Sequence, residues 1–241
     1  MNLVTTNWTN EDFAIYRKYL LSLKNTDEKV QRRITIINTK MEVLAIYSKE
    51  VKEISNYIFK ETNYISFLNN VDFKYYEETM IYGNIISKTK DFQKFKNFLK
   101  LLSTKTDNWA TVDNIKFTYF YKNHKDDMFN LSTKYLKDKE VFNRRYGILM
   151  LFDYINDNEY NKKIFDQLNN LINEEEYYVN IAASWLLCEM FIKQRKITLS
   201  YFENHKTNKF IINKGVQKCR ESFRVSDLDK ELLLKYKVKW L

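Results

Sequence analysis

A tryptophan, a carboxylate and two arginines near the middle of the chain are the residues whose types and spacing suggest chemistry. Trp109 and Asp113 are four residues apart, so on a helix they share one face. Arg144 and Arg145 occupy successive positions and point different ways; Arg145, four before Leu149, is expected nearer the buried side and so in need of an anionic partner. An aromatic face, a carboxylate and a guanidinium in one cleft can bind a cationic aromatic group beside a phosphate.

The elements that position these residues are expected to be helices throughout. The chain of 241 residues has no proline and only three glycines. It also lacks the Asn-Gly, Asp-Gly and Pro-Gly pairs that tight hairpins usually need. Hydrophobic residues make up 44% of the chain and charged residues 29%, a balance that indicates an ordered, buried core. We therefore predict an all-α fold, a helical repeat solenoid that forms a single domain over residues 1–241.

Hydrophobic periodicity and helix caps divide this fold into short helices joined by polar links. Residues 63–72 break the pattern and are expected to form a loop or a single turn. The expected helices are one capped by Thr9 or Asn10, Asp27–Thr39, one capped by Ser48, Tyr75–Lys88, Asp91–Ser103, Asp107–Phe120, Asp126–Leu136, Lys139–Ile155, Asp157–Ile172, Tyr177–Lys193, Ile197–His205, Asn208–Phe223 and Ser226–Lys237.

The candidate residues recur at the spacing of a helical repeat. Trp109, Arg145, Trp185 and Arg220 follow one another at separations between 35 and 40 residues. Two helices and their connections take about 40 residues in HEAT or armadillo arrays, and equivalent positions in successive repeats face the same side. We therefore expect one concave, basic face. Its expected members are Trp109, Asp113, Arg145, Trp185, Lys218, Arg220 and Arg224.

Each candidate also has a purely structural interpretation. Tryptophans of helical proteins belong to the core more often than to a ligand site, because they bury so much apolar area. Asp113 on its own is a solvated charge on a helix surface. The cluster of Lys218, Arg220 and Arg224 suits the C-terminal end of a helix dipole, or else a strip of phosphate contacts.

Charge and motifs narrow the class of function. The net charge of +9 favours an anionic partner, although the Lys- and Asn-rich composition also fits an AT-rich genome. No glycine-rich phosphate loop is present. The only histidines, His124 and His205, lie in polar surroundings, and Cys188 and Cys219 lack metal-ligand spacing, so we expect no metal site.

The same sequence indicates where the protein works. The N-terminus has neither a basic start nor an apolar core, so no signal peptide is expected. The longest apolar run, around Gly147–Phe152, is far shorter than the roughly 20 residues of a membrane span. We expect a cytoplasmic protein, not bound to membranes, with reduced and buried thiols.

Five stretches, taken in order, carry a resemblance to a known family. They are YEETMIYGNII (Tyr76–Ile86), DNWATVDNI (Asp107–Ile115), NRRYGILMLFDYI (Asn143–Ile155), YYVNIAASWLL (Tyr177–Leu187) and QKCRESFRVS (Gln217–Ser226). Together they resemble the DNA alkylation repair protein family, the AlkD-like DNA glycosylases built of HEAT-like repeats. The stretch Ile37–Ile54 departs from the pattern of this family, because it lacks the glycine, proline and arginine usual there. This predicts that the first repeats contact the substrate differently.

The resemblance implies excision of cationic N3- or N7-alkylated purines from duplex DNA, through hydrolysis of the N-glycosidic bond. We expect the protein to be a monomer. It implies that Asp113 is the catalytic carboxylate and that Trp109 and Trp185 are aromatic walls. It implies a backbone-phosphate contact for Arg145, which directly precedes the Tyr-Gly pair. The further expected DNA-binding residues are Arg144, Lys218, Arg220 and Arg224.

The residue types fit this chemistry without a cofactor or metal. An alkylated purine is positively charged, so its glycosidic bond is already weak, and a carboxylate can stabilise the oxocarbenium-like sugar and orient water. Two alternatives stay open. A non-catalytic nucleic-acid-binding HEAT-repeat protein would bind duplex DNA in a salt-sensitive way without base release. A protein-interaction scaffold would not bind DNA at moderate salt.

Overall fold

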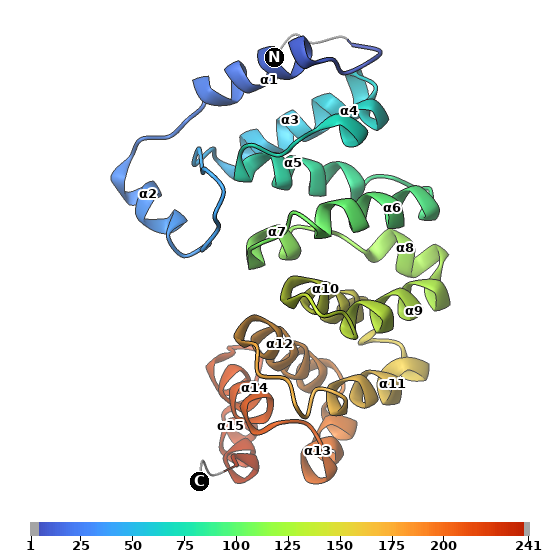
Figure 1. Ribbon diagram of the computed structural model, residues 1–241. Coiled ribbons are helices and arrows are strands. Elements are labelled where there is room, and N and C mark those ends of the chain that lie inside the picture. Colours follow the sequence, from blue (N-terminus) through green and yellow to red (C-terminus); the bar gives the residue numbers. More distant parts are fainter. Residues whose placement is uncertain (1–4, 239–241) are drawn as a thin grey trace. The chain divides into compact units, whose positions relative to one another are not determined.

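The computed structural model describes residues 5–238, and these residues form fifteen α-helices and two 3-10 helices. Within this part of the chain no strand forms, and Glu42 and Tyr75 make only an isolated bridge. The predicted all-α fold is therefore confirmed. The helices gather in two compact units, Met1–Tyr119 and Phe120–Leu241, which appear in blue to green and in green to red (Figure 1). The single domain over residues 1–241 stays a prediction.

The helices take their bounds from local caps and from burial. Those of the first unit are α1 (Asn10–Ser22), α2 (Glu28–Ile34), α3 (Ser48–Glu61), α4 (Tyr64–Asn70), α5 (Tyr76–Ile86), α6 (Phe92–Ser103) and α7 (Trp109–Asp113), and α8 (Thr118–Asn123) crosses the boundary. Those of the second unit are α9 (Lys125–Leu136), α10 (Val141–Met150), η1 (Leu151–Tyr154), α11 (Asn158–Asn169), α12 (Tyr177–Lys193), α13 (Arg195–Asn204), α14 (Lys209–Glu221), α15 (Asp227–Leu232) and η2 (Leu233–Tyr236).

Most predicted helices are present, with differences at their ends. Thr9, one of the two caps that the sequence predicted, caps α1, and it does so in a reciprocal capping box with Asp12. The prediction of a loop or a single turn over residues 63–72 was wrong for Tyr64–Asn70, which form a helix of seven residues. The side chain of Asn63 caps this segment, accepting the Ser66 N–H at 3.1 Å, and Phe67 is fully buried, so the residues form α4.

One part of the core of the first unit is an aromatic cluster formed by α1, α4 and Trp8, which precedes α1. The rings of Trp8 and Phe67 lie 4.9 Å apart at an interplanar angle of 69°, in an edge-on geometry that favours aromatic contacts. Arg17 of α1 pairs with the fully buried Glu78 of α5 at 3.0 Å. Because a buried carboxylate needs such a partner, the pair ties α1 to α5.

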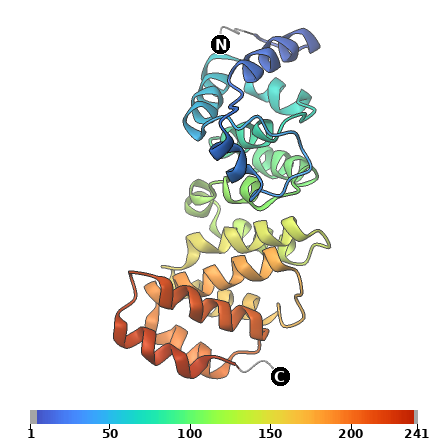
Figure 2. The ribbon, with the colours of Figure 1, turned by 90° about the vertical axis from the view of Figure 1, so that its left-hand side faces the viewer.

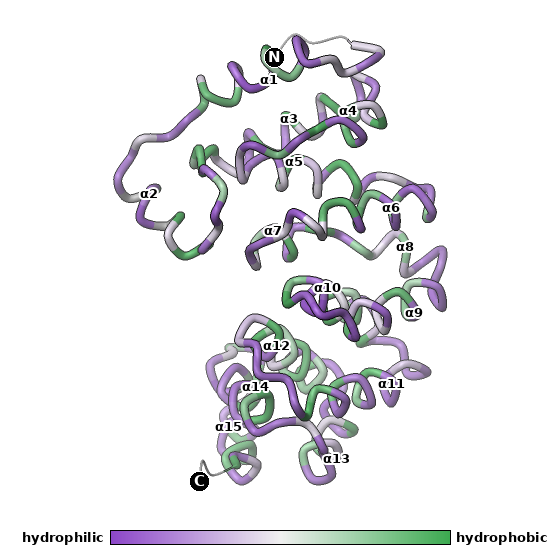
Figure 3. The backbone as a smooth tube through the Cα atoms, in the orientation of Figure 1, coloured by the Kyte–Doolittle hydropathy of each residue, from purple (hydrophilic) through white to green (hydrophobic). Residues whose placement is uncertain are grey.

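The second unit is a series of helices packed side by side, α9 on α10, α10 on α12 and α12 on α14. Figure 2 shows this series from another side, and Figure 3 shows hydrophobic and hydrophilic residues alternating along its helices, as expected where one face is buried. Ser132 of α9 donates to the Gly147 carbonyl of α10 at 2.9 Å. Ser184 of α12 donates to the Ile211 carbonyl of α14 at 3.3 Å, so small residues mark both helix contacts.

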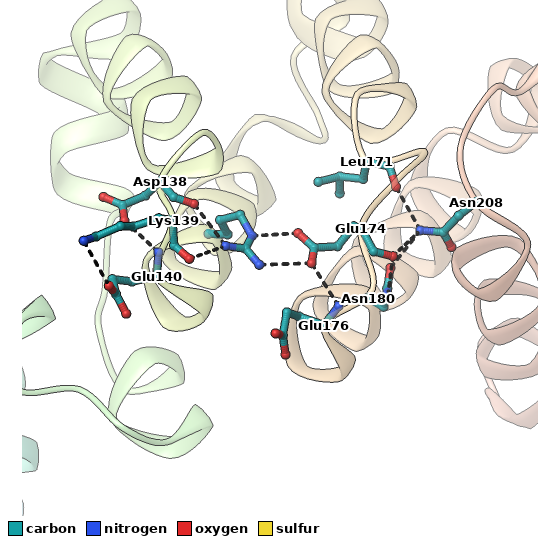
Figure 4. Close-up of polar contacts among 9 residues, drawn as sticks. Asp138, Lys139, Glu140, Leu171, Glu174, Glu176, Asn180 and Asn208 are labelled. Carbon is teal, nitrogen blue, oxygen red and sulfur yellow. Dashed lines mark hydrogen bonds and ion pairs between the residues drawn. The ribbon is translucent and has the colours of Figure 1, made fainter.

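Arg144 anchors the loops of the second unit. Its Nε and Nη2 donate to the Glu174 carboxylate at 2.7 and 3.1 Å, and its Nη1 donates to the carbonyls of Asp138 and Lys139 at 3.0 and 2.8 Å. Figure 4 shows these partners around one guanidinium. Such a two-pronged contact is the strongest arrangement open to an arginine and a carboxylate.

The contacts continue from Glu174 to the next helices. The Glu174 carbonyl accepts the side-chain amides of Asn180 and Asn208 at 3.0 and 3.2 Å, and Asn208 also reaches Asn180 at 3.0 Å and the Leu171 carbonyl at 2.8 Å (Figure 4). One connected network therefore joins the start of α10, the loop before α12 and the start of α14. We name it the polar spine, and its members are Arg144, Glu174, Asn180 and Asn208.

The close approach of α9 and α10 predicts a strong effect of Gly147→Ala. A Cβ there would lie 2.8 Å from the backbone N of Leu136 and 2.9 Å from the carbonyl O of Ser132, and backbone atoms cannot yield as a side chain can. We expect urea denaturation to show a loss of about 1–3 kcal/mol in unfolding free energy. Gly215→Ala is the control, since it meets only the Leu187 side chain; equal losses would contradict the prediction.

Candidate functional site

The short helix α7 is held against α5 by its middle residues. Asn108 caps it by accepting the Thr111 N–H at 2.9 Å. The hydroxyls of Thr111 and Thr79 hydrogen-bond at 2.8 Å, and Val112 is fully buried. Because the middle of α7 faces the core, the residues at its two ends, Trp109 and Asp113, are both left half-buried and on one side of the helix.

The predicted continuation of this helix through Phe120 was wrong. Helix α7 ends at Asp113, where Asn114 becomes the C-cap and its side-chain amide donates to the Met80 carbonyl at 3.0 Å. Ile115 and Phe117 are both buried, 4% exposed each, with an exposed residue between them. This alternation suits extended backbone and not a helix, so Asp113 stands at a helix end.

A segment from the N-terminal third docks on Trp109. The indole N–H of Trp109 donates to the Ile36 carbonyl at 3.0 Å. The Asp107 carboxylate accepts the Thr39 hydroxyl at 2.7 Å and the Lys40 backbone N–H at 2.6 Å. We call residues 36–40 the docking segment. Residues 37–40 of this segment lie in the stretch Ile37–Ile54, which lacks the glycine, proline and arginine expected from the resemblance.

Carboxylates of α5 hold the chain that leads away from the docking segment. Glu77, 2% exposed, accepts the backbone N–H groups of Leu44 and Ile46 at 3.1 and 3.3 Å. Between them Ala45 has a φ of 62°, a left-handed conformation that a non-glycine residue adopts only when its surroundings hold it. Burial raises the pKa of Glu77, although the backbone N–H groups oppose that shift. The acidic stretch of α5 therefore has a structural role.

The two adjacent arginines of α10 differ as the sequence predicted. Arg145 is 4% exposed and its Nη1 donates to the Tyr178 carbonyl at 2.6 Å. Arg144 is less buried and belongs to the polar spine. Both guanidinium groups therefore contact the loop and helix that follow them in the chain, and Arg145 helps to position the start of α12.

Trp185, on α12, is 39% exposed and lies at the surface of the second unit. Its ring centroid is 4.6 Å from that of Phe152, at an interplanar angle of 59°. Its indole also helps to lower the pKa of Glu189, one turn further along α12. Glu189 in turn pairs with both Nη atoms of Arg224, the Nη1 contact being 3.0 Å. Trp185 and Glu189 therefore lie one turn apart on α12, and Glu189 is paired with Arg224.

The contacts with Arg224 favour the ionised form of the Glu189 carboxylate. Its burial works to raise its pKa, but the hydrogen bonds and charge of Arg224 outweigh burial and hold the pKa of Glu189 below its usual value of 4.5. The remaining members of the basic cluster, Lys218 and Arg220, lie in the last turn of α14 and are partly exposed.

Two residues that organise the site were not selected from the sequence. Glu189 lies four residues after Trp185, so helical spacing alone places it beside the tryptophan. Asp107 was expected only as the first residue of a helix. Its contact with residues 39 and 40 joins parts of the chain far apart in sequence, and no local pattern signals it. Within residues 5–238, no three His, Cys, Asp or Glu side chains gather closely enough to hold a metal ion.

The Glu189 pairing predicts a pH-dependent stability difference. Because the folded-state pKa of Glu189 is lowered, its ion pair stabilises the fold above the unfolded carboxyl pKa, and this contribution is lost as pH falls through the folded-state pKa. We expect Glu189→Gln to cost about 0.5–1 kcal/mol at neutral pH, and the difference to shrink below about pH 4.5. Chemical denaturation over a pH series measures this. Glu221→Gln, which removes an exposed carboxylate, should show no comparable change; a constant difference for Glu189→Gln would rule out the linkage.

Comparison with known proteins agrees with the resemblance found in the sequence. In the described part of the chain, the helices fall short of the length and apolar character needed to cross a membrane. A search of curated proteins found no match. A family model described as DNA alkylation repair enzyme matches residues 16–218, which is most of the chain and includes α7, α10, α12 and most of α14. This protein therefore belongs to the DNA alkylation repair enzyme family.

Proposed function

We propose that this protein is a DNA glycosylase that excises cationic N3- or N7-alkylated purines from duplex DNA. The observation that carries the proposal is α7, which leaves Trp109 and Asp113 half-buried on one side of a helix, in a chain of the DNA alkylation repair family. A member of such a family acts on DNA, and the net charge of +9 favours binding to its phosphates.

In the proposed mechanism, Asp113 carries the catalytic step. Alkylation at N3 or N7 gives the purine a positive charge, so the glycosidic bond breaks with the base as a neutral leaving group. The sugar acquires oxocarbenium character, and a carboxylate stabilises that charge and orients or deprotonates the attacking water. The position of Asp113 at the end of α7 supports this role, because the side chain is not enclosed in the core.

Trp109 and Trp185 are proposed to contact the cationic base or the deoxyribose. Tryptophan faces attract cations more strongly than other aromatic rings, and both side chains keep part of their surface exposed. The Trp109 indole N–H is already bound to the Ile36 carbonyl. It follows that its ring orientation is set by the docking segment before DNA arrives.

Phosphate contacts are proposed mainly for Lys218 and Arg220. Arg144 uses its Nε and both Nη atoms within the polar spine, which makes it a poor phosphate ligand without loss of those contacts. Arg145 is 4% exposed and donates to the Tyr178 carbonyl, so a phosphate contact there requires its side chain to move. Arg224 keeps 43% of its side chain exposed while paired with Glu189, so it can approach a phosphate without leaving that pair.

The proposal predicts that Asp113→Asn loses base release and keeps DNA binding. Asparagine has nearly the same shape but lacks the charge, so we expect release of 7-methylguanine or 3-methyladenine to fall by about 10²-fold or more. Chromatography of bases freed from methylated duplex DNA measures release, and fluorescence anisotropy measures affinity. Asp127→Asn, in the exposed first turn of α9, is the matched control. Equal release by Asp113→Asn and the parent would reject this role for Asp113.

A non-catalytic DNA-binding protein of the same fold is the second candidate. It is favoured by the docking segment, because the Ile36 carbonyl occupies the indole N–H of Trp109 directly before the stretch Ile37–Ile54, which lacks residues expected from the resemblance. The same two assays separate the candidates. Salt-sensitive duplex binding without release of any base by the parent protein would establish the binding function alone.

A further inference from the structure

The docking segment is part of a longer loop, residues 24–43, that also carries α2 (Figure 1). The two ends of this loop lie together. The Asn25 backbone N–H donates to the Leu44 carbonyl at 2.9 Å, and the Lys24 ammonium group pairs with the Glu42 carboxylate at 3.2 Å. None of the side chains described between residues 24 and 43 is buried. Because the loop has so little apolar packing of its own, its position depends on its hydrogen bonds.

The carboxylate of Asp107 joins this loop to the site helix. Its Oδ1 accepts the Thr39 hydroxyl at 2.7 Å and the Asn108 side-chain amide at 2.9 Å, and its Oδ2 accepts the Lys40 backbone N–H at 2.6 Å. Asn108 is itself the N-cap of α7. Three donors thus converge on two oxygens, which suits a carboxylate and not an amide, because only the carboxylate accepts at both positions. We call the contacts of Asp107 with Thr39 and Lys40 the latch.

The latch lies three residues after the carbonyl that binds the Trp109 indole. The Ile36 side chain is 66% exposed, so burial of this residue does not hold the loop at that point. Its carbonyl accepts the Trp109 indole N–H at 3.0 Å. This contact therefore depends on the latch, which fixes the backbone on the C-terminal side of Ile36.

The bound indole N–H also limits how Trp109 can meet a ligand. Indole has one N–H donor and no acceptor. Once that donor is bound to the protein, the ring has only its apolar surface to offer to DNA. The faces of the ring are the surfaces that attract a cation. The contact with Ile36 therefore favours a cation–π contact of Trp109 over a hydrogen bond from its indole to a base.

We propose that Asp107 is a positioning residue for Trp109. By holding Thr39 and Lys40, its carboxylate keeps the Ile36 carbonyl in place, and that carbonyl sets the orientation in which the tryptophan ring meets the cationic base. The inference rests on the proposed function and adds a residue that acts through another side chain. A ring that is held in advance has little orientational freedom to lose when DNA binds, whereas a free ring would have to be ordered at that moment.

Two variants break the latch in different ways. Thr39→Val removes the hydroxyl donor and leaves the contact between Asp107 and Asn108 intact, so α7 keeps its cap. Asp107→Asn replaces one accepting oxygen by an N–H donor, which cannot bind a second donor. Both variants are expected to free the Trp109 indole from the Ile36 carbonyl.

NMR of the indole N–H groups measures this release in the absence of DNA. The chain has four tryptophans, and the spectrum of Trp109→Phe assigns the resonance. In Thr39→Val and Asp107→Asn, the Trp109 indole N–H is expected to exchange with solvent about tenfold faster or more, because the lost contacts are hydrogen bonds to a charged group. The indole of Trp8, which donates to the Thr62 hydroxyl at 3.3 Å in the same unit, is the internal control and should not change.

Two further variants of the same loop make the result specific to the latch. Thr39→Ser keeps the hydroxyl donor and should behave as the parent in every measurement. Thr35→Val makes the matched change at an exposed position, where the hydroxyl donates to the Arg32 carbonyl at 2.7 Å within the same turn. This variant should leave the Trp109 indole unchanged. Thermal melts identify any variant that fails to fold.

Base release measures whether the orientation of Trp109 matters for the proposed reaction. With methylated duplex DNA and the protein in excess, Thr39→Val and Asp107→Asn are expected to free bases as much as about 10²-fold more slowly, since misplacing a group of an active site by about 1 Å can have that effect. Thr39→Ser should restore the parent rate, and Thr35→Val should not change it.

Three results would overturn the positioning role of Asp107. Parent-like exchange of the Trp109 indole in both latch variants would show that the latch does not hold the ring. Equally fast exchange in Thr35→Val or Thr39→Ser would show that any change loosens the loop. Fast exchange together with parent-like base release would show that the orientation of the ring does not matter.

A parent protein that frees no base would refute the glycosylase and leave the positioning role testable. Fluorescence anisotropy with methylated duplex DNA then decides it. A loss of affinity of about tenfold in Thr39→Val and Asp107→Asn, on the order of one cation–π contact, with recovery in Thr39→Ser, would support the role. Parent-like affinity of both latch variants would overturn it.

Discussion

The ion pair between Arg144 and Glu174 is the constraint on which the second unit depends. Two largely buried charges are stable only if each has a partner and further hydrogen bonds, and here the same guanidinium also binds two carbonyls. Through the Glu174 carbonyl the network reaches Asn180 and Asn208. The starts of α10, α12 and α14 are thereby fixed to one another. The exposed side chains of α12 and α14, Trp185 among them, are therefore carried by helices in fixed positions.

Carboxylates act in the same way in the first unit, on backbone that is not helical. Glu77 accepts the backbone N–H groups on either side of Ala45, and Asp107 accepts the Thr39 hydroxyl and the Lys40 backbone N–H of the docking segment. The stretch Ile37–Ile54 is therefore ordered by acids that belong to two of the stretches that carry the family resemblance, Tyr76–Ile86 and Asp107–Ile115. Residues 39 and 40 of this stretch contact Asp107, just before the site helix α7.

Local patterns predicted most of the helices, because caps and hydrophobic periodicity are properties of neighbouring residues. They could not predict that α7 would stop at Asp113, since the stop depends on Ile115 and Phe117 burying in extended backbone. The same limit applies to the arginines. Helical spacing separated Arg145 from Arg144 correctly, but the partner of Arg144 lies thirty residues away, beyond the reach of any local pattern. Local patterns can predict that residues four apart on one helix, such as Trp185 and Glu189, are neighbours, but they cannot predict contacts between separate helices.

The proposed chemistry needs few catalytic groups at the glycosidic bond, whereas recognition of damaged DNA needs many contacts with the duplex. A cationic base already leaves readily, so one carboxylate at a helix end is enough to stabilise the developing charge. In the proposed function, discrimination between damaged and normal DNA would then come from contacts with the base and the DNA surface. Trp109 and Trp185 would supply such contacts, because both keep part of their surface exposed. Asp113 would set the rate of cleavage, and the tryptophans would set where cleavage occurs.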